Sequence, residues 1–166
     1  AAKTWRGMSG DRSRREDELG DKTLVIAGMG RIGSRLAMLA KAFDMRVIAI
    51  RRDPSKGAGA ADKVLGEESL LSMLPQADFV ALTCPLTPRT ENLIDATALA
   101  AMKPSAYLIN VARGKVVNEP ALIEALQENR IAGAALDCVW EEPLPASSPL
   151  WGVPKLLITP HTAGET

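Results

Sequence analysis

Three side chains suited to acid–base and ion-pairing chemistry stand in separate segments, each soon after a short apolar run. Arg113 lies in INVARG, Glu142 in LDCVWEEP, and His161, the only histidine of the sequence, in ITPHTAG. Taken alone, an arginine at a strand end is typical of a surface ion pair, and a lone histidine of a structural role. A loop glutamate alone is typical of a solvated carboxylate. Their joint placement favours a second interpretation.

That interpretation is hydride transfer to a keto acid. A guanidinium can bind a carboxylate through two hydrogen bonds, and an imidazolium can protonate a carbonyl oxygen. A carboxylate beside the imidazole would orient it and favour its protonated form. The interpretation requires that the fold brings Arg113, Glu142 and His161 to the place where a nicotinamide would be held.

Residues 23–52 are suited to hold such a cofactor. Gly28, Gly30 and Gly33 have GxGxxG spacing between an apolar run at 23–27 and a helix-favouring stretch, and a second apolar run follows at 46–50. The first glycine permits a tight turn, the second lets backbone approach a pyrophosphate, and the third lets helix and strand pack closely. The helix N-terminus favours phosphate. Although glycine-rich turns are common, this strand–turn–helix–strand context indicates a dinucleotide site.

The remaining sequence alternates between apolar runs and helical segments. Ile32, Leu36, Leu39 and Phe43 recur at helical spacing after the glycines, and Asp95 and Asn118 are suited to cap later helices. Further strands are predicted at 64–65, 78–83, 106–111, 131–137 and 155–159, and helices at 67–74, 96–102 and 119–127. This order predicts an α/β fold of Rossmann type: a doubly wound, mostly parallel sheet in three layers. Ligands bind such sheets beyond the carboxyl ends of the strands.

Composition narrows the class of protein. The 166 residues suit one domain, and 20 Lys plus Arg balance 20 Asp plus Glu, which argues against a nucleic-acid partner. No apolar run reaches the roughly 18 residues that a membrane helix needs. Cys84 and Cys138 lack CxxC spacing and suit a reducing, cytoplasmic location, and no cluster has metal-ligand spacing.

The sequence divides into two parts. Residues 1–22 are polar and mixed in charge, which favours a solvated, partly helical lead-in over a partner-binding arm. Residues 23–166 form the predicted dinucleotide-binding domain. Because the sequence opens without Met and stops just after a predicted strand, we expect a fragment of a longer protein.

Five motifs in a fixed order are more specific than the glycine fingerprint: GMGRIG, CPLTPRTENLI, INVARGKVVNEPALIEAL, GAALDCVWEEPLP and ITPHTAG. From about Leu19 to Thr166 the sequence resembles the nucleotide-binding domain of the D-isomer-specific 2-hydroxyacid dehydrogenase family. The resemblance implies that Arg113 binds the substrate carboxylate and that Glu142 pairs with His161. It also implies that His161 is the general acid in reduction of a 2-keto acid.

The resemblance further implies a set of cofactor contacts. Asp137 matches the residue that contacts the nicotinamide carboxamide, and the backbone of Arg31 and Ile32 matches positions that meet the pyrophosphate. The expected cofactor-binding set is Gly28, Gly30, Arg31, Ile32, Gly33, Arg51, Arg52, Cys84, Pro85, Thr90, Val111, Ala112, Asp137 and Gly164.

Two departures from the family pattern matter. NAD-specific members carry an acidic residue at the end of the second strand, where this sequence has Arg51 and then Arg52. Asp53, before Pro54, is expected to serve a turn instead. Either NAD or NADP is therefore expected as cofactor, with the two arginines favouring NADP.

The second departure is that the family's substrate domain is missing, so we expect the fragment to be poorly active alone. We also expect a homodimer, with residues 1–22 and 144–152 as candidate contacts. An alternative from another functional class stays open, because the C-terminal-binding-protein co-repressors resemble the same domain: a nucleotide-sensing interaction protein.

Overall fold

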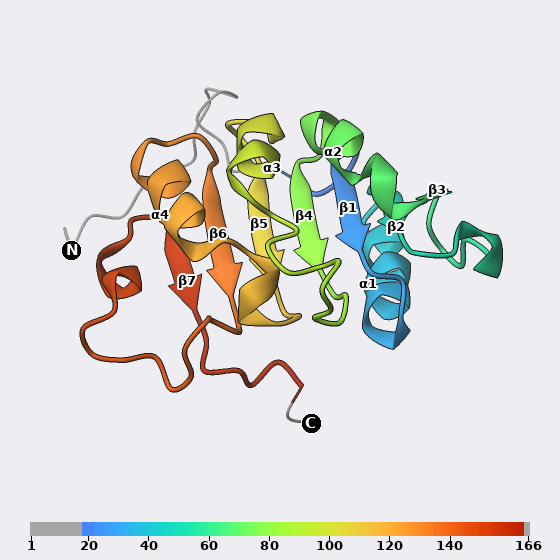
Figure 1. Ribbon diagram of the computed structural model, residues 1–166. Coiled ribbons are helices and arrows are strands. Elements are labelled where there is room, and N and C mark those ends of the chain that lie inside the picture. The colour runs from blue at the N-terminus through green and yellow to red at the C-terminus, as the bar shows by residue number, and fades with distance from the viewer. Residues whose placement is uncertain (1–17, 165–166) are drawn as a thin grey trace, which may run out of the picture.

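The computed structural model describes residues 18–164. Of the predicted, partly helical lead-in over residues 1–22, residues 1–17 therefore fall outside the described residues, and residues 18–22 form a turn rather than a helix. Seven parallel strands form one sheet in the order β3-β2-β1-β4-β5-β6-β7 (Figure 1). Their bounds are β1 Thr23–Ala27, β2 Arg46–Ile50, β3 Lys63–Leu65, β4 Phe79–Leu82, β5 Tyr107–Asn110, β6 Gly133–Leu136 and β7 Leu156–Ile158. The strand order reverses between β1 and β4, which is the Rossmann-type topology that the sequence predicts.

Strands β4 to β7 are each shorter than the range that the sequence predicts. β4, predicted at 78–83, keeps only Phe79–Leu82. Asp78 accepts a hydrogen bond from the Thr23 N–H at 2.8 Å, and the Thr83 hydroxyl donates to the Gly28 carbonyl at 2.6 Å. Both side chains therefore join β4 to β1, one at each end of the pair.

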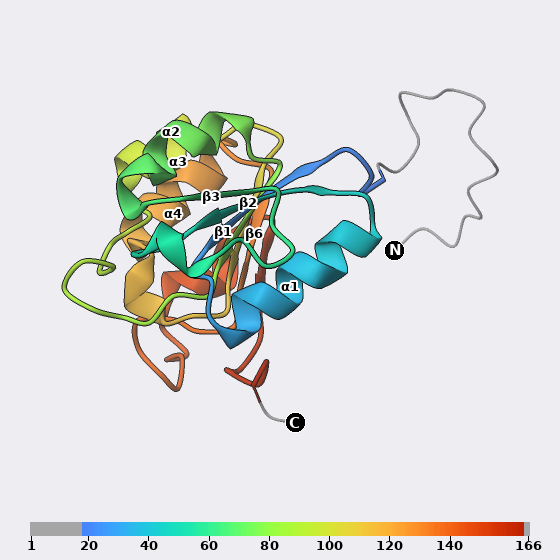
Figure 2. The ribbon, with the colours of Figure 1, turned by 90° about the vertical axis from the view of Figure 1, so that its right-hand side faces the viewer.

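The helices lie on both faces of the sheet (Figure 2). On one face lies α1 (Arg31–Ala42), and on the other lie α2 (Leu70–Met73), α3 (Ala96–Ala101) and α4 (Glu119–Gln127). Asp95 caps α3 by accepting from the Ala98 N–H, and Asn118 caps α4 by accepting from the Ala121 N–H. Both predicted caps are confirmed.

Helix α1 buries small residues rather than the large apolar ones that mark its period. Gly33, Ala37 and Ala40 are buried against the sheet, whereas Ile32 is 59% exposed and Phe43 58% exposed. The spacing thus predicted the helix correctly but not its buried side. A stripe of small residues lets α1 approach β1 and β2 closely, and leaves its outer apolar side chains uncovered by residues 18–164.

The three-layer arrangement is complete over only part of the sheet. α1 packs on β1 and β2, but within residues 18–164 no helix covers the same face of β5 and β7. Tyr107 and Leu157 point from this face and are 46% and 62% exposed, and the Tyr107 ring stacks on Phe79 at 5.7 Å. Parallel sheets are usually buried on both faces, so this exposed apolar surface departs from the usual pattern within residues 18–164.

Candidate functional site

The glycine-rich turn lies at the carboxyl edge of the sheet, between β1 and α1. Gly28 has φ +107°, and a Cβ there would lie 2.6 Å from the Cys84 backbone N. A Cβ on Gly33 would lie 2.1 Å from the Gly28 carbonyl oxygen, whereas a Cβ on Gly30 would have no heavy atom within 4 Å. Packing within the protein therefore requires the first and third glycines. The second faces open space, where a bound group could approach the backbone closely.

A cavity of about 600 Å³ opens beside this turn, between the ends of β1, β2 and β4. Seven of the predicted cofactor contacts line it: Gly28, Gly30, Arg51, Arg52, Cys84, Pro85 and Thr90. The others do not: Arg31, Ile32, Gly33, Val111, Ala112, Asp137 and Gly164. The cavity thus contains the predicted contacts on the β2 and β4 side of the turn.

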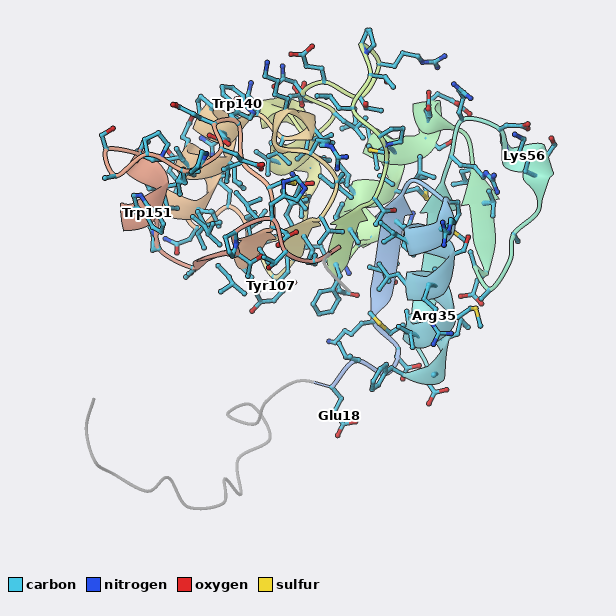
Figure 3. All side chains as sticks on the ribbon, turned by 90° about the horizontal axis from the view of Figure 1, so that it is seen from below. Glu18, Arg35, Lys56, Tyr107, Trp140 and Trp151 are labelled. Carbon is cyan, nitrogen blue, oxygen red and sulfur yellow. The ribbon has the colours of Figure 1, made fainter. Side chains whose placement is uncertain are left out.

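Cations gather at one end of this cavity, which Figure 3 locates by the label of Lys56. Arg51 donates through Nη1 to the Gly57 carbonyl at 3.2 Å, and neither Arg51 nor Arg52 has a carboxylate ion-pair partner within residues 18–164. Asp53 is a turn residue, since its carboxylate accepts from the Ser55 hydroxyl at 2.5 Å and from the Ser55 N–H at 3.1 Å. These hydrogen bonds lower the pKa of Asp53. The positive end of the cavity suits an anionic group.

Several lining residues were not among the predicted contacts, and three of them are Thr83, Lys56 and Arg89. The Thr83 hydroxyl holds the Gly28 carbonyl, and Arg89 pairs with Glu67 at 2.8 Å. Thr83 could have been found as the polar residue that ends the run DFVALT. Lys56 and Arg89 lie in proline-containing loops, where sequence spacing does not specify position.

The loop that carries Arg113 is fixed by a buried asparagine that the sequence analysis also missed. Asn110, 0% exposed, accepts from the Ala112 N–H and donates to the Arg113 carbonyl, both at 3.0 Å. A Cβ on Gly114 would lie 1.9 Å from the Val139 carbonyl oxygen, so this loop packs tightly on the loop after β6. The asparagine within the apolar run INVARG was the available signal. Arg113 itself is exposed at the end of this rigid loop.

Glu142 and His161, 19 positions apart, meet at the same edge. The His161 Nδ1 lies 2.7 Å from Glu142 Oε2, and Glu142 Oε1 accepts from the Val139 N–H at 3.0 Å. Burial would raise the pKa of Glu142, but the bonds from His161 and Val139 and the charge of Arg113 outweigh it and lower the pKa. Arg113 is near enough to influence Glu142, yet within residues 18–164 no hydrogen bond or ion pair joins it to Glu142 or His161.

A second cavity, of about 670 Å³, borders this pair. It is lined by Asp137, Val139, Glu142, Pro143, Leu144, Trp151, Ile158, Thr159, Pro160 and His161, without Arg113. Figure 3 views this edge of the sheet from below, with Trp151 and Lys56 on opposite sides of the molecule. The acid–base pair and the positive cavity are therefore separate features of one edge.

The two cysteines are free and buried. Burial raises the pKa of Cys84, and burial together with the charges of Glu142 and Asp137 raises the pKa of Cys138 to about 12. Neither thiol is activated as a nucleophile. Over residues 18–164, no helix is long and apolar enough to cross a membrane, and no group of His, Cys, Asp and Glu is arranged to hold a metal ion.

A parallel sheet of this order, with an open glycine turn at its switch point, defines a dinucleotide-binding domain. The model of the D-isomer specific 2-hydroxyacid dehydrogenase NAD binding domain matches residues 1–163, and the chain belongs to this family.

Similar proteins and solved structures support the same family assignment. The glyoxylate reductase of Aeropyrum pernix is 44% identical over 151 residues, covering 90% of this chain and 44% of that protein. A family member from Aeromonas salmonicida has a TM-score of 0.87 at 38% identity, covering 95% of this chain and 48% of that one. A member from Xanthobacter autotrophicus, solved with NADPH and MES, has a TM-score of 0.79 at 38% identity, covering 84% and 57%. The chain thus spans about half the length of these proteins.

Proposed function

We propose that this chain is the cofactor-binding part of an NAD(P)-dependent enzyme that reduces a small 2-keto acid to a D-2-hydroxy acid. The observation that carries the proposal is the pair of His161 Nδ1 and Glu142 Oε2, 2.7 Å apart, at the sheet edge that also holds the open glycine turn. The name of the Aeropyrum relative supports a substrate of this class.

The chemistry follows from the positions of the side chains. A bound nicotinamide would supply the hydride to the carbonyl carbon. Because Nδ1 of His161 faces Glu142, Nε2 is the atom left to give a proton to the carbonyl oxygen, or to take one in oxidation. Glu142, whose pKa is lowered, stays ionised and stabilises the imidazolium. Arg113 would bind the substrate carboxylate, since its guanidinium is exposed and without a carboxylate partner in residues 18–164.

The residues present fit a dinucleotide. The open side of Gly30, with the backbone of Arg31 and Ile32, would meet the pyrophosphate at the start of α1. Arg51 and Arg52 would face the ribose 2′ position and favour NADP. Cys84, Pro85 and Thr90 would line one side of the cofactor, and Val111, Ala112, Asp137 and Gly164 would lie toward the nicotinamide.

We further propose that the activity needs the family's substrate domain, and that the protein is a cytoplasmic homodimer. The free cysteines suit a reducing compartment. Within residues 144–152, Trp151 is 61% exposed while its indole N–H donates to the Pro145 carbonyl, which holds a large apolar ring at the surface. A sedimentation experiment that finds only monomer at high micromolar concentration contradicts the dimer.

Cofactor binding is the direct test of the nucleotide assignment. Titration of the 166-residue chain with NADH and NADPH should show NADPH bound at least as tightly. The double variant R51Q/R52Q should weaken NADPH at least tenfold and leave NADH unchanged, because only NADPH carries the 2′-phosphate. Lys41→Gln, at the opposite edge, is the matched control. At least tenfold tighter binding of NADH than of NADPH by the parent chain would overturn the preference.

Turnover tests the reaction. A protein that includes the substrate domain should reduce glyoxylate or hydroxypyruvate, and the 166-residue chain should do so poorly. Nucleotide binding without turnover in the longer protein would favour the co-repressor-like interaction protein instead.

A further inference from the structure

The carboxylate of Asp137, at the end of β6, is bound to the segment that carries His161. Asp137 is only 6% exposed. Its Oδ1 accepts from the Thr159 hydroxyl at 2.5 Å and from the Thr162 N–H at 3.0 Å, and its Oδ2 accepts from the Ala163 N–H at 3.0 Å. All three donors flank His161, one before it and two after. A single buried carboxylate thus holds the segment from both sides.

His161 has a backbone conformation that needs such support. Its φ is +56°, in the left-handed region that residues other than glycine adopt uncommonly. Its N–H donates to the Thr159 carbonyl at 3.0 Å, so the chain turns sharply through Pro160. Residues 159–163 are exposed, so little packing fixes this turn. The Thr159 N–H also donates to the Leu136 carbonyl of β6 at 3.0 Å, but after Thr159 the bonds that tie the backbone of this segment to β6 are those from Thr162 and Ala163 to Asp137.

Glu142 cannot replace this anchor. It touches only the imidazole, through Nδ1, and is itself held by the Val139 N–H. If the segment moved, the ring would leave Glu142 even though the glutamate stayed in place. Charge-assisted bonds to a buried carboxylate are stronger than neutral ones, and they lower the pKa of Asp137 although burial alone would raise it.

We propose that Asp137 is a positioning residue that fixes the backbone of residues 159–163 and so places the His161 imidazole against Glu142. This inference rests on the proposed function for its purpose, but its geometry is independent of it. A cofactor contact by Asp137 is compatible, because Oδ2 accepts only one of these bonds and keeps a second lone pair. The same carboxylate would then align the acid with the nicotinamide.

The test uses nuclear magnetic resonance on the 166-residue chain, in which His161 gives the only imidazole signals. Asp137→Asn keeps Oδ1 but puts an NH₂ group opposite the Ala163 N–H, so two donors face each other. Amide hydrogen exchange of Ala163 should accelerate at least tenfold, and the imidazole ¹⁵N signals should change from one tautomer to a mixture. Asp137→Ala should also accelerate exchange of Thr162.

Two controls separate positioning from general destabilisation. Glu142→Gln should change the imidazole signals and leave the Thr162 and Ala163 amides protected. Amides in β1 and β5 should keep their exchange rates in Asp137→Asn. If Asp137→Asn does not fold, Thr159→Val removes one exposed donor and should produce the same change at smaller size.

Two outcomes overturn the inference. The first is equal Thr162 and Ala163 exchange in Asp137→Ala and the parent chain. The second, in the enzyme with its substrate domain, is a raised cofactor KM for Asp137→Asn with unchanged kcat. A lower kcat at unchanged cofactor KM supports it. The proposed function can fail separately. If the enzyme with its substrate domain reduces no keto acid, but Asp137→Asn still loses amide protection at Ala163, the proposed function is wrong and the positioning role of Asp137 is supported.

Discussion

At the amino edge of the sheet several cations form ion pairs with carboxylates, whereas at the carboxyl edge most arginines have no carboxylate partner within residues 18–164. Lys41 pairs with Asp62 and Lys103 with Asp78, each at 2.8 Å. At the opposite edge only Arg89, among the described arginines, has such a partner. Arg51 and Arg113 donate to backbone carbonyls instead.

The difference shows which charged groups at each edge are left to bind a ligand. An ion pair between two side chains of the same protein stabilises the fold, and neither charge is then available to bind a ligand. Arg51 and Arg52, which line a cavity and have no carboxylate partners within residues 18–164, form a positive field that suits an anion from outside, such as a phosphate. Glu142 and His161 form a different kind of pair at the carboxyl edge, because it joins a carboxylate to an imidazole, which can donate or accept a proton.

The largest predicted effect concerns substitutions in the glycine turn, which separate a structural glycine from one that faces a ligand. Gly33→Ala should lower the free energy of unfolding by about 3 kcal/mol, because its Cβ would lie 2.1 Å from the Gly28 carbonyl oxygen. Gly30→Ala should leave the melting temperature unchanged and still weaken NADH binding at least tenfold, since its Cβ meets nothing but a ligand. Calorimetry and titration measure the two effects. Equal nucleotide affinity in Gly30→Ala and the parent chain would show that the pyrophosphate does not lie there.

The next largest effect is expected when one cation of each edge, Arg113 or Lys103, is replaced by glutamine. Arg113→Gln should lower kcat/KM of the enzyme with its substrate domain by roughly a hundredfold, the loss typical of one charge-stabilising donor. Its melting temperature should not move, because the guanidinium is exposed and bonded only to a carbonyl.

Lys103→Gln, its counterpart at the amino edge, should do the reverse, lowering stability and leaving turnover intact. If the Arg113→Gln enzyme keeps full activity, the proposed difference between the two edges is wrong.

The pH dependence of stability probes the amino edge. Burial would raise the pKa of Asp78, but its bonds to Lys103 and to the Thr23 N–H outweigh it and lower the pKa. The folded pKa therefore lies below the unfolded value of about 3.9. This contribution is present above that value and is lost as the pH falls through the folded pKa. Chemical unfolding of Asp78→Asn should show about 1 kcal/mol less stability at pH 7 and a flatter decline in acid. An unchanged acid limb would contradict this.

The smallest effect concerns Glu119, at the start of α4, which accepts from the Trp140 N–H. Burial raises the pKa of Glu119, although that bond opposes the shift. A carboxyl group with a raised folded pKa costs stability as the pH rises above its unfolded pKa, about 4.3. Glu119→Gln keeps the acceptor and removes the charge, so the melting temperature at pH 7 should stay equal or rise slightly. A clear fall would show that the charge itself holds Trp140.

Much of the secondary structure could be predicted from local sequence patterns. Strand β1, helix α4 and the two helix caps lie where the sequence predicts them, because burial on both faces and capping chemistry act over a few neighbouring residues. The order of motifs along the chain predicted that Arg113, Glu142 and His161 would lie at one edge of the sheet. Glu142 and His161 meet there, whereas Arg113 makes no bond to either within residues 18–164.

Tertiary structure alone decided which atoms meet. The three bonds that join Asp137 to the His161 segment depend on how distant turns pack, and the small residues that α1 buries depend on how the helix lies on the sheet. The resemblance already implied that Glu142 pairs with His161, and the structure adds which atoms meet, Oε2 and Nδ1 at 2.7 Å. Sequence spacing fixes a side chain's direction within its own helix or strand. Contacts between loops depend on the positions of several strand ends at once, which no single stretch of sequence encodes.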